Sequence, residues 1–288
     1  MTTSQNRKVS VIVPNYNYGK YIKKRIDSIC KQTYPIYELI ILDDASTDGS
    51  ADQLKEIVLD MKIKNPEMRV RFVGNTKNSG KAMMQWKNGF ELAEGDFVWI
   101  AEADDLSNRK FLEEVMKAFD DPEVVLSYTE SMIINSAGLM IVPNFRWSRD
   151  KEKTGHYKQS YVKEGCREIE EIMAIRCTIP NVSGVVFRKK AVKLKDLEKA
   201  IELTQVGDWY LYARVIEGGK ISYNRKSLNK FRIHGGSKTA ESKKNRKHYE
   251  EVLEIHDSFR KRFELSKKVL EAMLAEEARI REKHDIIE

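Results

Sequence analysis

Three carboxylates directly follow an apolar run in the stretch 97–105. Residues 97–100, FVWI, have the apolar, β-favouring character of a strand that is buried on both faces. Glu102, Asp104 and Asp105 then lie within four positions. Carboxylates this close repel one another unless a cation lies between them, and Mg²⁺ or Mn²⁺ prefers such oxygen ligands together with substrate phosphates. The stretch therefore indicates either a divalent-cation and phosphate site or a solvated acidic loop.

The elements that must position this stretch alternate between strand and helix. Apolar runs typical of buried strands occur at 9–13, 38–42, 70–73, 97–100 and 124–128. Between them, apolar residues recur with the 3.6-residue period of a helix. This alternation predicts an α/β fold with a mostly parallel central sheet flanked by helices. Polar residues follow the first, second and fourth runs, at the edge where open α/β sheets bind ligands.

The second half of the chain has a looser pattern. Strands are expected at 183–187, 220–223 and 228–233. Helices are expected at about 168–176, at 192–203 and from Gly207 onward. From about residue 240 the chain has a helical and charged pattern, with neither Gly nor Pro.

Composition limits the class of protein. The chain has 288 residues, of which 41% are hydrophobic and 33% charged, and this favours a globular protein with one large domain or a domain and an appendage. No apolar run reaches the roughly 18 residues of a membrane span, and the amino terminus has no signal-peptide core. The three distant cysteines, Cys30, Cys166 and Cys177, indicate neither a disulfide framework nor a zinc site. We therefore expect a reducing, cytoplasmic location.

The net charge of +7 is concentrated near the carboxyl end. Residues 225–268 hold fourteen Lys and Arg against six Asp and Glu. Such a region can face anionic lipid, a phosphorylated substrate, nucleic acid or simply water. Apolar residues at helical spacing in the same region must bury against the body of the protein, a second copy or a further domain. A basic, aromatic-bearing helix could also lie on an anionic membrane.

Six stretches occur in a fixed order along the chain: VIVPNYN, IILDDASTDGS, NSGKAMMQWKNGFELAEGD, IAEADD, GDWYLY and FRIHGGS. Together they resemble the inverting family-2 glycosyltransferases over about residues 8–238. The resemblance implies the GT-A fold and a catalytic domain at 1–238. That domain would have a nucleotide half at about 8–128 and an acceptor half at about 129–238, followed by a charged helical extension at 239–288.

The resemblance also implies roles in nucleotide binding. The backbone around Pro14 and the polar group of Asn17 would line the nucleotide pocket. Asp43 or Asp44 would accept a hydrogen bond from the ring N–H of a uracil or thymine base. An Asx turn is the alternative role for this pair.

Further positions match the phosphate and metal side of the family pattern. Gly80 and Lys81 would lie close to the nucleotide, although Lys81 could equally be a surface lysine. Asp104 would meet the ribose or the metal, and Asp105 would bind the metal that bridges the diphosphate. Glu102 stands where many members have an aspartate, so its contact with sugar or metal stays open.

The last two stretches match the acceptor side of the family pattern. Asp208 would be the general base that removes the proton of the acceptor hydroxyl, and a helix cap is its alternative role. Gly207 precedes it where many members carry an acidic residue. Trp209 and Arg232 would contact substrate, the latter through a carboxylate or phosphate. His234 matches a histidine that some members use as a ligand of Mn²⁺ or Mg²⁺, and a structural histidine in a turn is its alternative.

The resemblance implies metal-dependent, inverting transfer of a sugar from a nucleotide-diphosphate sugar to a hydroxyl of a glycan or lipid-linked acceptor. A UDP-sugar is the first expectation and a dTDP-sugar the second. Bacterial surface polysaccharide synthesis is the expected setting, in the cytoplasm or peripherally at the inner face of the membrane. One alternative is a nucleotidyltransferase that makes sugar nucleotides, although its Gly-rich loop after the first strand is missing. The other is a basic nucleic-acid-binding module, which lacks a recognisable reading motif.

Overall fold

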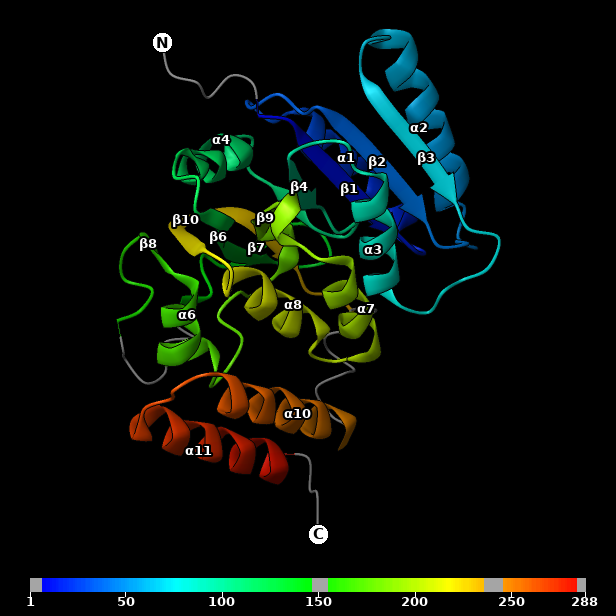
Figure 1. Cartoon of the computed structure of the whole chain (residues 1–288). Coiled ribbons are helices and arrows are strands. Elements are labelled where there is room, and N and C mark those ends of the chain that lie inside the picture. The colour runs from blue at the N-terminus through cyan, green and yellow to red at the C-terminus, as the bar shows by residue number, and fades with distance from the viewer. Residues whose placement is uncertain (1–6, 147–154, 236–245, 284–288) are drawn as a thin grey trace.

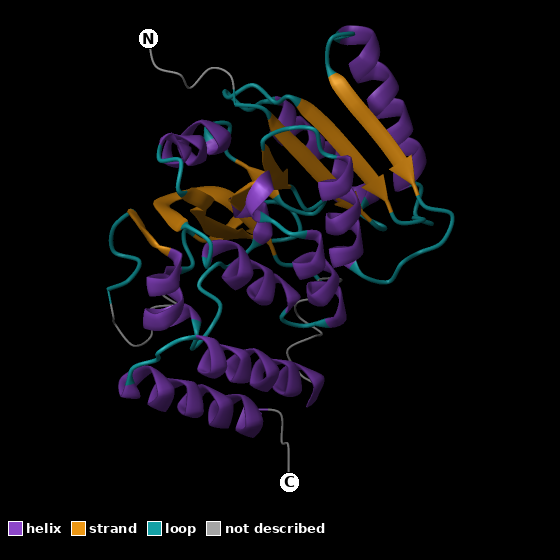
Figure 2. Cartoon of the chain, in the orientation of Figure 1, coloured by secondary structure: helices purple, strands orange, loops and turns teal. Residues whose placement is uncertain are grey.

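The computed structural model describes residues 7–146, 155–235 and 246–283. Its centre is a sheet with the strand order β3-β2-β1-β4-β9-β6-β10-β5, and β7 and β8 pair with β6 and β10. Figures 1 and 2 show helices on both sides of this sheet, with α10 and α11 beyond α6 and α8.

The strands are β1 Val9–Asn15, β2 Glu38–Asp43, β3 Arg69–Gly74, β4 Phe97–Ile100, β5 Leu106–Ser107, β6 Val124–Ile134, β7 Met140–Val142, β8 Tyr161–Glu164, β9 Val185–Arg188 and β10 Lys220–Arg232. The helices are α1 Gly19–Cys30, α2 Ser50–Lys64, α3 Ala82–Leu92, α4 Phe111–Met116, α6 Gly165–Glu168, α7 Leu194–Glu202, α8 Gly207–Ile216, α10 Arg246–Arg262 and α11 Lys267–Lys283. A π-helical turn, Ile169–Met173, continues α6.

The predicted α/β fold class is confirmed. Strands β3, β2, β1 and β4 are parallel neighbours, as the alternation of strand and helix predicts. Beyond them, β9 runs antiparallel between β4 and β6, while β6 and β10 are parallel. The two strands expected at 220–223 and 228–233 form the single strand β10. Shifts of register in its pairing with β6 between Asn224 and Asn229 accommodate the polar residues that interrupt its apolar pattern.

Side chains of the parallel strands alternate between two hydrophobic cores. On β1, Val9, Val11 and Val13 belong to the core shared with α1, α2 and α4. Ile12, between them, belongs to the other core, which α3, α7 and α8 cover. The strands read as continuous apolar runs because both faces are buried.

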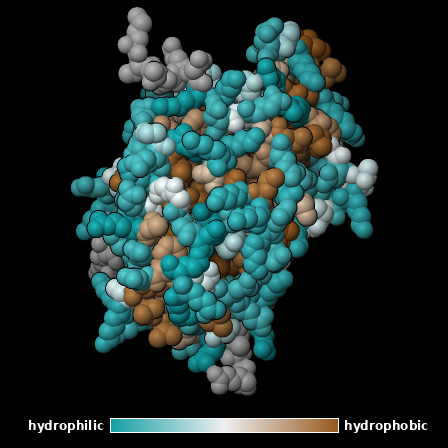
Figure 3. Space-filling view, in the orientation of Figure 1, coloured by the Kyte–Doolittle hydropathy of each residue, from teal (hydrophilic) through white to brown (hydrophobic). Residues whose placement is uncertain are grey.

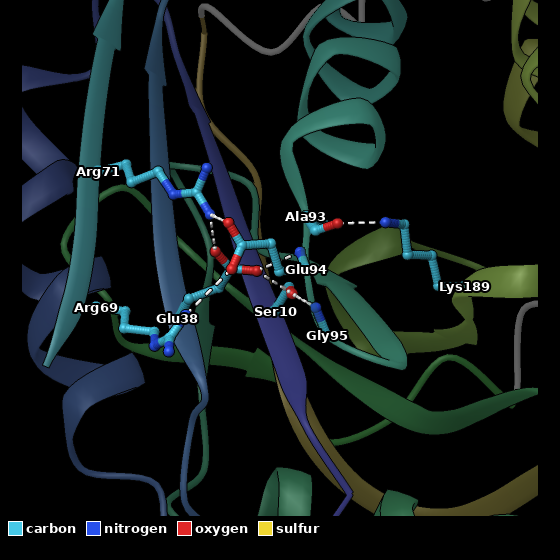
Figure 4. A network of polar contacts seen from close by, with 8 residues as sticks. All are labelled: Ser10, Glu38, Arg69, Arg71, Ala93, Glu94, Gly95 and Lys189. Carbon is cyan, nitrogen blue, oxygen red and sulfur yellow. Dashed lines mark hydrogen bonds and ion pairs between the residues drawn. The ribbon is translucent and has the colours of Figure 1, made fainter.

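The amino ends of β1, β2 and β4 are held together by a buried carboxylate, drawn in Figure 4. Glu38 accepts hydrogen bonds from Ser10 Oγ (2.6 Å) and from the backbone N–H of Glu94 (2.5 Å). Arg71 donates to Glu38 (2.9 Å) and also pairs with Glu94. The N–H of Gly95 donates to Ser10 Oγ (2.9 Å). This network fixes the turn into β4, and therefore the strand that carries the acidic stretch at its far end.

The carboxyl-terminal helices pack on the body of the protein. Val252, Ile255 and Phe259 of α10 and Met273 of α11 are buried in the same core as Trp209 of α8. Of the three alternatives for the apolar residues of the tail, namely the body of the protein, a second copy or a further domain, the structure shows burial against the body. The predicted boundary at 238/239 lies outside the described residues.

The surface is mostly hydrophilic, as Figure 3 shows. Hydrophobic side chains gather at the outer end of α2, where Leu59 and Ile63 are 62% and 70% exposed. Within the described ranges, none of the helices combines the length and the apolar character that crossing a bilayer requires.

Candidate active site

Polar side chains from neighbouring strands meet at the carboxyl edge of the parallel strands. Asn15 and Asp43 are partners in the register of β1 and β2, and Asn15 Nδ2 donates to Asp43 Oδ1 (2.7 Å). The same amide group lies within hydrogen-bond distance of Ser46 Oγ (3.1 Å) and Ser50 Oγ (2.9 Å). Asp43 also accepts from the N–H (3.0 Å) and hydroxyl (2.6 Å) of Ser46, the Asx-type turn that was the alternative for this residue.

Asp44 ties the loop after β3 to the end of β2. Its carboxylate accepts from Asn75 Nδ2 (2.7 Å), Ser79 Oγ (2.7 Å) and Gln85 Nε2 (2.9 Å). The N–H of Ser79 also donates to it, at 3.0 Å. Gly80 follows with a φ of +74°, a conformation that glycine adopts without strain. Asp44 therefore sets the position of the loop in which the resemblance places nucleotide contacts.

Two residues other than glycine adopt left-handed backbone conformations at this edge. Asn17 has a φ of +59° and Ala45 a φ of +60°. The side chain of Asn17 accepts from Thr47 N (2.7 Å), and its own N–H donates to Ser46 Oγ (3.0 Å). Pro14 lies within β1, paired with Leu42. Such conformations cost about 1–3 kcal/mol each and concentrate at functional sites, so these two loops are candidate ligand-binding loops.

Glu102 is joined to α3 by a hydrogen bond. Trp86 Nε1 donates to Glu102 Oε1 at 2.7 Å. Desolvation, followed by repulsion from Asp104, raises the pKa of Glu102 to about 8. This carboxyl group is therefore largely protonated at neutral pH.

Asp105 lies deeper than its neighbours and is 1% exposed. Its Oδ1 accepts from the backbone N–H of Arg232 (2.8 Å), and its Oδ2 accepts from Asn181 Nδ2 (2.9 Å). Burial, with Asp104 as the second cause, raises the pKa of Asp105 to about 7. Asp105 therefore joins Arg232 of β10 and Asn181, which precedes β9, to the loop after β4. A metal contact at Asp105 stays a prediction.

Asp104 and His234 meet across 130 residues of sequence. His234 Nε2 lies 3.1 Å from Asp104 Oδ2. The rings of Tyr18 and Tyr21 flank the imidazole, with centroids 5.8 and 5.1 Å away. Arg232 Nε donates to the backbone carbonyl of Asp104 (2.6 Å). The buried Arg232 also donates to the carbonyl of Asn135 (2.8 Å), so its side chain joins the acidic loop to the turn after β6.

A buried guanidinium lies behind the acidic stretch. Arg25 on α1 is 0% exposed, and its side chain lies over the ring of Trp99 at 5.0 Å. Its Nη1 is 3.4 Å from Ser107 Oγ, and neither Nε nor Nη2 has a hydrogen-bond partner among the described residues. Burial lowers the pKa of Arg25 to about 10 against the attraction of Asp105 and Asp104, so it stays charged at neutral pH.

The donor atoms of this edge suit a divalent cation. Across the described residues, no group of three or more His, Cys, Asp and Glu side chains has a metal-binding arrangement. Asp104 and His234 do bring one carboxylate oxygen and one imidazole nitrogen together. Mn²⁺ accepts both, and Mg²⁺ commonly takes one or two protein carboxylates with substrate phosphates completing its shell. The residues present therefore fit a cation whose shell the substrate completes.

Asp208 lies in the first turn of α8, beside a cavity of about 700 Å³. Its Oδ1 accepts from the N–H of the next residue, Trp209 (2.8 Å), within the first turn, while the N-cap position of α8 is Val206. Trp86 lines the same cavity and holds Glu102, so the cavity adjoins the acidic stretch. Lys81 also lines it, with its ammonium group donating to the carbonyl of Ile201 (2.9 Å).

The neighbours of Asp208 are fixed by packing. A Cβ at Gly207 would lie 2.3 Å from the carbonyl oxygen of Ala200, so α7 and α8 leave room for glycine alone. This contact explains why no acidic residue precedes Asp208. The indole of Trp209 is buried and donates to the carbonyl of Met173 (3.0 Å), which gives it a role in packing; a substrate contact there stays a prediction.

Comparison with known proteins decides the class. The family model "Glycosyl transferase family 2" matches residues 10–167, more than half of the chain. The chain belongs to glycosyl transferase family 2. The chain therefore contains a glycosyltransferase domain of this family with a GT-A-type fold, and this assignment replaces the nucleotidyltransferase and nucleic-acid-binding alternatives.

Relatives and solved structures agree with this assignment. The uncharacterized glycosyltransferase alr2836 of Nostoc sp. is 27% identical over 240 residues, covering 80% of this chain and 66% of alr2836. TarS of Staphylococcus aureus in complex with UDP-GlcNAc has a TM-score of 0.67 at 21% identity, over 95% of this chain and 72% of that one. The mannosyltransferase PcManGT of Pyrobaculum calidifontis, in complex with GDP-Man and Mn²⁺, has a TM-score of 0.58 at 18% identity, over 96% and 70%.

Proposed function

We propose that this glycosyltransferase transfers a sugar, with inversion, from a nucleotide-diphosphate sugar to a hydroxyl of a glycan or lipid-linked acceptor. A UDP-sugar is the proposed donor, with a dTDP-sugar as the second candidate. The observation that carries the proposal is that the carboxylates of the acidic stretch and the carboxylate of Asp208 lie on elements joined by Trp86. The acidic stretch adjoins the cavity of Asp208 through Trp86. The UDP-GlcNAc complex of the similarly folded TarS supports the choice of donor.

In the proposed donor site, the nucleotide lies over the carboxyl ends of β1 and β2. The backbone around Pro14 and the loop of Asn17 line the pocket, and Asp43 or Asp44 accepts from the ring N–H of the base. Gly80 and Lys81 close the pocket from the loop before α3. Both aspartates are already oriented by hydrogen bonds from protein donors, so little reorganisation is needed when a base arrives.

On the phosphate side, Asp104 and His234 are the proposed ligands of Mn²⁺ or Mg²⁺, with Asp105 behind them as a further candidate. When bound, the cation would stabilise the negative charge that builds on the leaving diphosphate. Arg232 holds the main chain of Asp104 in position for this task. Glu102 stays a candidate for contact with the sugar or the metal.

On the acceptor side, Asp208 is the proposed general base. A sugar hydroxyl is a poor nucleophile at neutral pH until its proton is removed, and a carboxylate within hydrogen-bond reach supplies this step. The attack then occurs on the face of the sugar opposite the leaving diphosphate, which inverts the anomeric configuration.

The proposed setting is bacterial surface polysaccharide synthesis in the cytoplasm or at the inner face of the membrane. Contact with anionic lipid would use the basic region 225–268, which holds an excess of eight positive charges. A second copy or a further domain would contact the outer face of α10 and α11.

The test is substitution of the proposed base. Asp208→Asn should retain UDP binding and the wild-type unfolding temperature, while kcat for transfer falls by about 10²–10⁴-fold, the usual contribution of a general base. Asp52→Asn is the matched control, because Asp52 is an exposed aspartate in the first turn of α2. Transfer at the wild-type rate by folded Asp208→Asn protein would remove Asp208 from this role.

A further inference from the structure

The hairpin formed by α10 and α11 lies outside the residues matched by the family model, yet it contacts the segment that carries Asp208. Glu251 on α10 is buried. Its carboxylate accepts from the N–H (2.9 Å) and hydroxyl (3.1 Å) of Thr204, from Gln205 N (2.7 Å) and from Val206 N (3.3 Å). These three residues lead directly into α8. One side chain of the hairpin therefore holds the whole approach to the proposed base.

Glu251 accepts four hydrogen bonds from this loop, and hydrogen bonds to a carboxylate are stronger than those to a neutral acceptor. The carboxylate also lies beside the amino terminus of α8, where the helix dipole stabilises negative charge. Without Glu251 the same N–H groups would be buried with no acceptor, which is unfavourable, so the conformation of this loop depends on Glu251.

A second contact of α10 holds the chain on the other side of Asp208. The ring of His256 packs edge-on against the indole of Trp209, with centroids 5.6 Å apart. His256 is itself held between Glu277 of α11 (Nδ1 to Oε1, 2.6 Å) and the carbonyl of Ile175 (3.2 Å). The residues before and after Asp208 are thus both fixed by the same helix.

The hairpin also walls the cavity that Asp208 faces. The cavity is lined by Val252 of α10 and by Arg279 and Ile280 of α11, together with Trp86 and Asp208. A displacement of the hairpin would therefore change both the direction of the Asp208 carboxylate and the width of the space in which an acceptor hydroxyl must lie.

We propose that the α10–α11 hairpin is a working part of the acceptor site and that Glu251 is a positioning residue for Asp208. This proposal rests on the proposed role of Asp208 as general base. Positioning of this kind acts on the chemical step, because misplacement of a base by about 1 Å can cost 10²-fold in rate. Asp43 and Asp44, at the nucleotide side of the proposed donor site, are held by Asn15 and by the loop before α3 rather than by the hairpin, so we expect the KM for the donor to change little.

The test is Glu251→Gln, which keeps the size of the side chain but removes its charge. It should lower kcat at least tenfold with an unchanged KM for the UDP-sugar. Glu250→Gln is the matched control, because Glu250 is its exposed neighbour on α10 and, within the described part of the chain, pairs with Arg246 on the same helix. If Glu251→Gln does not fold, Thr204→Val removes one of the four hydrogen bonds and should lower kcat in the same direction by less.

A double-mutant cycle separates positioning from a merely structural role. If Glu251 acts through Asp208, Glu251→Gln should have little further effect on kcat in an Asp208→Asn background. An equal loss in both backgrounds, or a kcat like that of Glu250→Gln, would overturn the proposal. Wild-type transfer by Asp208→Asn alone would instead contradict the proposed function, so the two failures are distinguishable.

Discussion

At the scale of single residues, the carboxylates of this edge are held by polar side chains from other segments, as Asp43 is by Asn15. Asp43, Asp44, Asp104 and Asp105 are recognisable because they follow apolar runs. The groups that orient them are amides and hydroxyls from distant segments, such as Asn181 for Asp105, and amides have no periodicity or spacing of their own. The burial of Arg25 is also not predictable from the sequence, because a charged residue in a basic turn of an amphipathic helix is expected to be exposed. Arg25 is buried because of the way α1 packs on the sheet.

The first prediction at this scale concerns metal binding. Mn²⁺ should raise the unfolding temperature of the wild-type protein, because a ligand that binds only the folded state stabilises it by mass action. His234→Gln and Asp104→Asn should each reduce this shift, since each removes one of two ligands that lie 3.1 Å apart. Thermal unfolding with Mn²⁺ and with EDTA measures it, with Asp52→Asn as control. A Mn²⁺ shift that is unchanged in both variants would contradict the assignment.

A second prediction concerns the close approach of α7 and α8. Gly207→Ala should destabilise the protein by about 1–3 kcal/mol and lower kcat, because the added Cβ would lie 2.3 Å from the carbonyl of Ala200 and must displace α8. Gly218→Ala is the matched control, with its nearest neighbouring atom at 3.8 Å. Urea unfolding and transfer assays measure both. Equal unfolding midpoints for the two variants would show that α8 tolerates the displacement.

At the scale of elements, apolar periodicity predicts most strands and helices, and the misses have local causes. From about residue 240 the pattern predicts a helical extension, without giving the number of helices in it. In the structure α10 ends at Arg262 and α11 begins at Lys267, with Ser266 Oγ accepting from Val269 N (3.3 Å). A capping serine such as Ser266 is a weak signal within a charged sequence. The joining of the two short strands at 220–223 and 228–233 into β10 depends on pairing with β6, which the sequence does not show.

The contact between the hairpin and the body predicts a pH dependence of stability. Burial lowers the pKa of His256 below its ordinary value of 6.5, and this outweighs the opposing effect of Glu277. Between the folded-state pKa and 6.5, the unfolded chain therefore binds a proton that the folded chain does not, and stability falls as the pH falls below about 6.5. The folded protein should lose stability between pH 7 and pH 5.5.

His256→Gln is the variant for this prediction, because glutamine cannot titrate but keeps a polar side chain. Its urea midpoint should lie below that of the wild type at pH 8, since the packing on Trp209 is lost, and the difference should shrink toward pH 5.5. Fluorescence-detected urea unfolding at both pH values measures it. A constant difference across this range would mean that His256 does not titrate within it.

At the scale of the whole molecule, the α/β class and the edge that carries the site follow from the alternation of strand and helix. The position of the tail does not follow from the sequence, because an apolar stripe on a helix indicates burial but does not identify the surface that buries it. In the structure the tail shares one hydrophobic core with the body: Val252, Phe259 and Met273 are buried with Trp209 of α8. The residues predicted as a separate extension thus cover the half of the protein that carries Asp208.

The last prediction follows from that shared core. A chain that ends at residue 238 exposes the surface now covered by Val252, Ile255, Phe259, Met273 and Ile280, each of which is at most 4% exposed. Burial of such side chains contributes about 1.5–3 kcal/mol each, so the loss is of order 10 kcal/mol, comparable to the 5–15 kcal/mol that stabilises a typical domain. The shortened chain should aggregate or bind a hydrophobic dye, whereas a chain that ends at residue 283 should unfold like the full chain. A soluble, cooperatively unfolding chain 1–238 with wild-type transfer activity would instead establish the catalytic domain as independent, and would also remove the hairpin from the acceptor site.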